Sequence, residues 1–106
     1  MNRTLTLTRQ VVTVLAVAAM VGPARADERL FAKQGCTACH SIERQVVGPS
    51  LNDVARKYKA RDDAVTYLAL KLQQGSVGVW GQIPMPANPG ISADDARVLA
   101  AWILAR

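Results

Sequence analysis

The sequence predicts a small all-α domain that carries one long loop rich in glycine and proline. Several segments repeat apolar residues at spacings of three and four, which is the period of an amphipathic helix. No segment alternates apolar and polar residues in the way that a half-buried strand does. The chain has 106 residues, which suits one domain of this kind.

The first 26 residues are expected to be a cleaved secretory signal peptide. Arg3 and Arg9 give a positive start, residues 11–21 form an uncharged and largely apolar run, and residues 24–26 read ARA, a small-x-small cleavage pattern. An uncleaved membrane anchor is the alternative, but a spanning helix needs roughly 20 apolar residues. No cysteine near the cleavage site offers a lipid anchor. The domain is therefore expected in residues 27–106, exported to the periplasm.

Removal of this leader changes the charge and the core available for folding. The leader holds three of the 13 basic residues and none of the eight acidic ones, so the net charge falls from +5 to +2. Such a charge gives little reason to expect a nucleic acid or a membrane as partner. The remaining domain has one Phe, two Tyr and two Trp to fill its core. Domains this small often need a disulfide, a metal or a comparable group to be stable. A large apolar cofactor would supply the missing bulk, and we expect a monomer.

Two helices are expected in the first half of the domain. Asp27 can cap a short helix that runs through Lys33, and Gly35 would end it. Pro49 fits the first turn of a second helix, because proline is favoured at that position. The apolar face of this second helix, at positions i, i+3, i+4 and i+7, carries Leu51, Val54, Ala55 and Tyr58.

Two further helices are expected in the second half. Asp62 can cap a third helix, which Gly75 would end. Its apolar stripe consists of Val65, Leu68, Ala69 and Leu72. Ser92 followed by Asp95 resembles a capping box and predicts the start of the last helix. The apolar face of that helix carries Ala96, Leu99, Ala100 and Ile103.

Residues 75–91 form a long segment with four glycines and three prolines and no strand pattern. A loop of this length in a compact domain is usually functional or disordered. The segment nevertheless contains several apolar side chains, which indicates that it packs against something. These side chains are Val77, Val79, Trp80, Ile83 and Met85.

Residues 36–40 read CTACH, the C-x-x-C-H attachment signature of c-type haem. Cys36 and Cys39 are about one helical turn apart, so each thiol can add to one haem vinyl group. His40 then follows with its imidazole directed at the iron. A thioredoxin-like disulfide would require a βαβ context, which is missing, and a structural zinc site would require four ligands. The motif therefore predicts one covalently bound haem c.

The sixth iron ligand is expected to be Met85. Met1 and Met20 leave with the signal peptide, so Met85 is the single methionine of the mature chain, as His40 is its single histidine. The prolines on both sides of Met85 stiffen the loop. A lone methionine is often core filler, but a rigid loop in a haem protein favours ligation.

Three motifs in order resemble the small bacterial class I cytochromes c of the c-551/c-552 type. They are residues 47–49 (VGP), residues 80–88 (WGQIPMPAN) and residues 99–104 (LAAWIL). The resemblance implies the class I cytochrome c fold, in which helices wrap around one low-spin haem with His and Met ligands. It also implies a single-electron carrier of respiratory chains, fed by a quinol-oxidising complex and supplying a nitrite reductase or a terminal oxidase.

The resemblance further implies roles around the haem. The carbonyl of Pro49 would accept the ring N–H of His40, and Trp80 would donate its indole N–H to a propionate. Asn88 would orient the methionine sulfur, and Lys71 stands where some relatives have an arginine near a propionate. Packing for Trp80 and a turn-forming role for Asn88 are the alternatives. Tyr58 and Trp102 are expected in the core or at the haem edge.

The leading alternative function is a haem enzyme or sensor with an open or labile sixth position. An enzyme of the peroxidase kind needs a distal His or Arg, and no second histidine exists. We therefore expect an electron carrier and not an enzyme, with transient redox proteins as partners. A basic cluster could steer an acidic partner, although solvated surface charge is the default. This cluster consists of Arg56, Lys57, Lys59 and Arg61.

Overall fold

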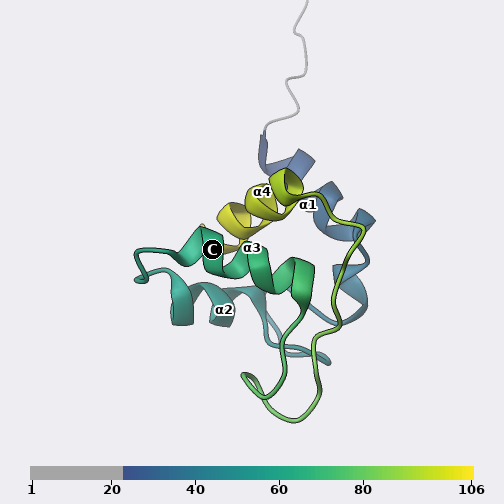
Figure 1. Ribbon diagram of the computed structural model, residues 1–106, viewed down its shortest axis with the longest axis vertical. Coiled ribbons are helices and arrows are strands. Elements are labelled where there is room, and N and C mark those ends of the chain that lie inside the picture. Colours follow the sequence, from purple (N-terminus) through teal and green to yellow (C-terminus); the bar gives the residue numbers. More distant parts are fainter. Residues whose placement is uncertain (1–22) are drawn as a thin grey trace, which may run out of the picture.

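The computed structural model describes residues 23–106, with side chains described from residue 27 onward, and shows a helical domain (Figure 1). No strand occurs in this part of the chain, where only two isolated β-bridges form. The predicted all-α class is thus confirmed. The elements are α1 (Pro23–Lys33), the 3-10 turn η1 (Cys36–Ala38), α2 (Leu51–Tyr58), α3 (Ala64–Gln74) and α4 (Ala93–Leu104).

Helix α1 begins earlier than expected, at Pro23 and not at Asp27. Proline suits the first position of a helix, and the alanines and arginine that follow it favour helix, so the helical segment extends through them. The expected cleavage point after Ala26 lies inside this helix, and residues 1–22 of the expected signal peptide lie outside the described residues. The helix ends at Lys33 as predicted, before Gly35 at φ 77°.

Helix α2 is capped by Ser50, so the prediction that Pro49 occupies its first turn is wrong by one to two residues. The Ser50 hydroxyl accepts a hydrogen bond from the Asp53 backbone N–H at 3.1 Å. A serine oxygen satisfies one of the unpaired N–H groups of a helix start, which proline cannot do. Pro49 therefore lies outside the helix, and its carbonyl is available to another residue.

Helix α3 begins one residue later than predicted, with Asp63 and not Asp62 at the N-cap position. The Asp63 carboxylate makes no capping bond, because it accepts two hydrogen bonds from Arg61, at 2.8 and 3.1 Å. Gly75 ends the helix at φ 76°, as predicted. Of the predicted stripe, Val65 is only half-buried, and Ala64 is buried in addition.

Helix α4 forms the centre of the domain and packs against α1, α2 and α3, most extensively against α3 (Figure 1). The Ser92 hydroxyl accepts the Asp95 backbone N–H at 3.1 Å, which confirms the predicted cap. Its predicted apolar face is buried, and Trp102 joins it. The side chains with no exposed surface are Ala96, Leu99 and Ala100.

The segment between α3 and α4 leaves the helices as one long loop and returns to α4 (Figure 1). Met85 packs against the core, as expected, but Val77 is 80% exposed, so its expected packing against the protein is wrong. Val77 directly follows Ser76, the residue that pairs with Met85. Within residues 23–106, no helix has the length and apolar character needed to cross a membrane.

Candidate functional site

The cysteine motif lies on a tight turn directly after α1. Gly35 reverses the chain, and the turn closes through hydrogen bonds from the backbone N–H groups of Cys39 and His40 to the Cys36 carbonyl, at 3.1 and 2.9 Å. Cys36, Cys39 and His40 therefore come from one compact turn, as the motif predicts. Both thiols are free and half-buried. Burial raises the pKa of the Cys36 thiol, the opposite of what a thiol oxidoreductase needs.

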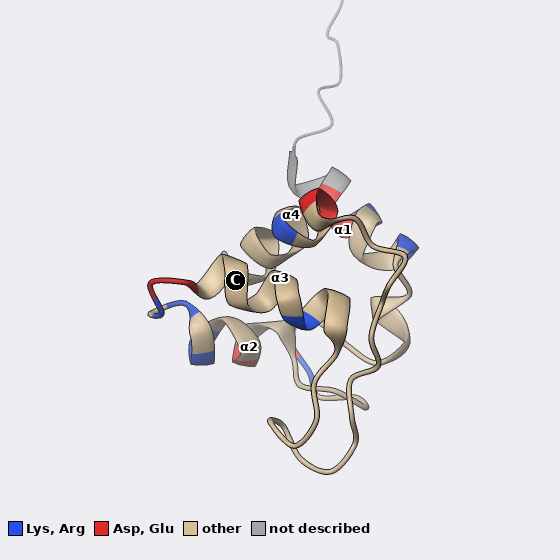
Figure 2. Cartoon of the chain, viewed as in Figure 1, with Lys and Arg blue, Asp and Glu red and all other residues tan. Residues whose placement is uncertain are grey.

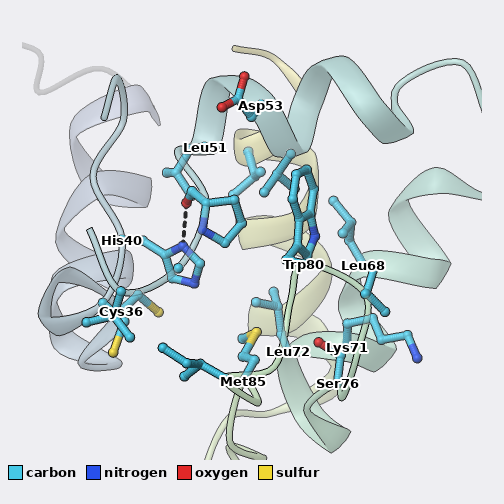
Figure 3. Close-up of a pocket in the computed structure, with 18 of the residues that line it drawn as sticks. Cys36, His40, Leu51, Asp53, Leu68, Lys71, Leu72, Ser76, Trp80 and Met85 are labelled. Carbon is cyan, nitrogen blue, oxygen red and sulfur yellow. Dashed lines mark hydrogen bonds between the residues drawn. The ribbon is translucent and has the colours of Figure 1, made fainter. Parts of the chain in front are cut away.

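The imidazole of His40 is fixed by a backbone carbonyl. Its Nδ1–H donates to the Pro49 oxygen at 2.7 Å, the bond drawn dashed in Figure 3. This bond leaves Nε2 free to act as a ligand. Gly48 lies against the ring, where a Cβ atom would come within 2.5 Å of His40 Cε1. Sequence reasoning missed this role of Gly48, whose only signal was its place in the VGP motif.

The backbone of Met85 is held by hydrogen bonds to Ser76, near the start of the same loop. Its backbone N–H donates to the Ser76 carbonyl at 2.9 Å, and the Ser76 N–H donates back at 3.0 Å. Gly75 permits this pairing, because a Cβ at that position would lie 2.5 Å from the Met85 carbonyl oxygen. Figure 3 shows the sulfur of Met85 and the imidazole of His40 turned toward the same space.

That space is a cavity of about 280 Å³, lined by residues from α1, η1, α2, α3, α4 and the long loop. Cys36, Cys39, His40 and Met85 all reach it. The remaining walls are largely apolar and include Phe31, Leu51, Val54, Leu68, Leu72 and Ile103. Two thiols on one edge, an imidazole and a thioether facing each other, and apolar walls form a donor set that fits a haem attached through thioethers.

Trp80 and two tyrosines lie together at the cavity edge. The Tyr58 ring is buried, 6.2 Å from Trp80 in an edge-on arrangement and 5.1 Å from Tyr67. The Lys57 ammonium lies 5.0 Å from the Trp80 ring centroid. Desolvation by burial is the main factor that raises the pKa of Tyr58. Trp80 itself remains 40% exposed, so its indole stays accessible from the cavity mouth.

The remaining predicted residues take several positions. Lys71 lines the cavity, with its ammonium 5.3 Å from the Tyr67 ring centroid. Trp102 packs against Phe31 in the core, at 5.4 Å between ring centroids. The Asn88 side chain donates to Gln34 Oε1 at 3.0 Å, a partner that the sequence did not indicate.

Acidic side chains elsewhere in the described chain are not gathered into a metal-binding cluster. In residues 27–106, no group of three or more His, Cys, Asp or Glu side chains could hold a metal ion by itself.

Comparisons with known proteins agree with this geometry. Residues 26–106 match the family model described as cytochrome c. Cytochrome c-552 of Nitrosomonas europaea is 56% identical over 85 residues, which cover 80% of this chain and 82% of the relative. Cytochrome c-552 of Hydrogenobacter thermophilus is 45% identical, over 86% of this chain and 92% of the relative. The crystal structure of the wild-type Nitrosomonas europaea protein superimposes with a TM-score of 0.72, covering 74% of this chain and 96% of that one.

Proposed function

Because the chain belongs to the cytochrome c family, whose members are haem-based electron carriers, we propose that it is a periplasmic single-electron carrier in which His40 and Met85 would ligate the haem iron. Family membership confirms the predicted class I fold and the covalently attached haem c. We further propose that the signal peptide is cleaved after Ala26 and that the protein exchanges electrons with redox partners in the periplasm.

The observation that carries the proposal is the pair of fixed donors across one apolar cavity. The His40 ring is held by the Pro49 carbonyl, and the Met85 backbone is held by Ser76. When bound, the haem supplies a one-electron couple between ferric and ferrous iron. These contacts would keep the donor positions constant in both oxidation states, which favours rapid outer-sphere transfer.

The other residues hold the group and set its potential. Cys36 and Cys39 would form the thioether links, and the thioether of Met85, a soft donor, would favour the reduced state and raise the potential. The apolar walls exclude water and act in the same direction. At the cavity edge, the indole N–H of Trp80 and the ammonium of Lys71 are the groups available to the propionates.

A carrier fits the residues better than a haem enzyme or sensor. The mature chain contains one histidine and one methionine, and both are used as ligands in this arrangement. The side chains that line the cavity include no second histidine and no arginine. The distal histidine or arginine that a peroxidase uses is therefore not among these lining residues.

Partners are proposed to be redox proteins that dock transiently, with this protein as a monomer between an upstream complex and a nitrite reductase or terminal oxidase. The basic cluster at the end of α2 lies beside acidic residues (Figure 2). Arg56 pairs with Asp53, and Arg61 pairs with Asp63. The Lys57 ammonium lies over the Trp80 ring, so Lys59 is the member of the cluster with the most freedom to meet an acidic partner.

Four measurements on the protein expressed with its leader test the proposal. Acid–acetone extraction should leave the haem on the polypeptide, and mass spectrometry of the periplasmic protein should give Asp27 as its first residue. The oxidised protein should show a methionine-to-iron charge-transfer band, and the reduced protein should resist carbon monoxide. Ready carbon monoxide binding without that band would overturn the carrier assignment.

A further inference from the structure

A hydrogen bond between two side chains joins the segment just before the cysteine motif to the long loop that carries Met85. This loop, residues 75–91, is called the methionine loop below. Asn88 Nδ2 donates to Gln34 Oε1 at 3.0 Å, across a sequence separation of 54 residues. Gln34 stands two residues before Cys36, and Asn88 stands three residues after Met85. The bond therefore connects the segments that carry the two axial ligands.

This connection has no parallel among the described residues. The other hydrogen bonds between side chains, Arg56 to Asp53 and Arg61 to Asp63, span two or three positions. No other hydrogen bond in the described part of the chain joins residues 27–48 to residues 75–91. Among the described residues, the bond between Gln34 and Asn88 is therefore the hydrogen bond that connects the methionine loop to the segment that carries His40.

Both ends of the bond are anchored by the backbone. The Gln34 N–H donates to the Leu30 carbonyl at 3.0 Å, which continues the last turn of α1. The Asn88 N–H donates to the Gln73 carbonyl at 3.2 Å, and the Ile91 N–H donates to the Asn88 carbonyl at 3.3 Å. Gln34 and Asn88 are half-buried and border a hollow that Cys39, His40 and Met85 also line. A bond between fixed and partly buried partners resists opening more than a bond on a mobile surface does.

We propose that Gln34 is a positioning residue for the methionine loop. Its amide oxygen holds Asn88, and the loop is thereby kept closed with the Met85 sulfur at the sixth ligand position. The inference rests on the ligation by Met85 proposed above. The bond from Asn88 to Gln34 thereby determines how often the loop opens and admits an external ligand to the iron.

The test compares three variants of the holoprotein, with imidazole as the probe of loop opening. Gln34→Ala removes the acceptor, Gln34→Glu keeps an acceptor oxygen at the same distance from the backbone, and Gln74→Ala is the matched control. Gln74 is exposed at the end of α3, and its side chain makes no hydrogen bond in the described structure. Stopped-flow mixing measures the imidazole association rate of each oxidised protein.

Loss of one hydrogen bond should raise the imidazole rate of Gln34→Ala about two- to tenfold, since such a bond contributes about 0.5–1.5 kcal/mol. Gln34→Glu should restore the wild-type rate, and Gln74→Ala should match wild type. In an Asn88→Ala background, Gln34→Ala should have no further effect, because its partner is already gone.

Two outcomes overturn the role of Gln34. In one, the imidazole rates of Gln34→Ala and Gln74→Ala are equal; in the other, the urea midpoint of Gln34→Ala falls while its imidazole rate stays at the wild-type value. The charge-transfer band of the wild-type protein is recorded first. Its absence overturns the Met85 assignment together with the role of Gln34, whereas its presence with unchanged rates overturns the role of Gln34 alone.

Discussion

The ring of His40 lies between the carbonyl of Pro49, which accepts its Nδ1–H at 2.7 Å, and the backbone of Gly48, which leaves no room for a side chain. The carbonyl fixes the tautomer, and the glycine fixes the tilt of the ring. The other ring nitrogen, Nε2, then faces the cavity.

Gly48→Ala should displace His40. The added Cβ would lie 2.5 Å from His40 Cε1, so the ring or the backbone must move. Overpacking of this kind costs about 1–3 kcal/mol, and the holoprotein should show a lower urea midpoint and a changed reduction potential. Gly90→Ala is the control, since its Cβ would meet only Asn88 Oδ1 at 3.7 Å. Equal midpoints for the two variants would contradict the steric argument.

Met85→Ala should lower the reduction potential and open the sixth position. Removal of a soft donor destabilises the reduced state relative to the oxidised state, and the reduced variant should bind carbon monoxide. Redox titration and carbon monoxide difference spectra measure both effects. Val77→Ala, in the same loop but 80% exposed and outside the cavity lining, should behave as wild type. An unchanged potential in Met85→Ala would mean that another residue is the ligand.

Gly75→Ala should disturb the methionine loop more than Gly78→Ala does. Both glycines have a positive φ, 76° and 75°, so an alanine would be strained at either position. Only at Gly75 does the added Cβ also meet the Met85 carbonyl, at 2.5 Å, whereas nothing lies within 4 Å of the Gly78 position. The charge-transfer band should therefore weaken or shift in Gly75→Ala and persist in Gly78→Ala. The same band in both variants would show that crowding at Gly75 has no effect on the ligand.

Tyr58 should make the protein less stable at alkaline pH. Burial raises the pKa of Tyr58 in the folded state above its ordinary value of about 10. The neutral phenol is thus favoured by folding, and its contribution to the free energy of unfolding is complete below the unfolded pKa. That contribution is lost as the pH rises through the folded pKa. Urea unfolding between about pH 9 and 12 should show a smaller decline in Tyr58→Phe than in wild type; parallel declines would contradict this assignment.

Leu99→Ala should be strongly destabilising. Leu99 has no exposed surface and lies on the face of α4 at the centre of the core. A leucine-to-alanine change in such a position costs about 2–5 kcal/mol, because a cavity remains. Val98→Ala, on the neighbouring residue that is 44% exposed, should cost far less. Urea unfolding of both variants measures the difference, and comparable losses would place the centre of the core elsewhere.

The helices illustrate how far sequence patterns reach. The buried faces of α2 and α4 followed from the spacing of apolar residues, because burial on a helix is periodic along the chain. The starts of α1, α2 and α3 were each misplaced by one to four residues. Ser50 caps α2 through its hydroxyl, whereas Asp63 stands at the N-cap of α3 although its carboxylate is engaged by Arg61, so the position of a helix start does not depend on a free capping side chain alone. In the sequence, neighbouring residues such as Asp62 and Asp63 are equally good candidates for the N-cap position.

By itself, the sequence determined the covalent chemistry and the candidate ligands of this protein. The thioether cysteines and His40 lie within five residues, so their geometry is local, and elimination left Met85 as the candidate for the second ligand. Only the tertiary structure decided how these ligands are held. The contacts of Gly48 with His40, Ser76 with Met85 and Gln34 with Asn88 join residues 8, 9 and 54 positions apart. Such contacts depend on how separate segments of backbone approach one another, and no local pattern of residues encodes that approach.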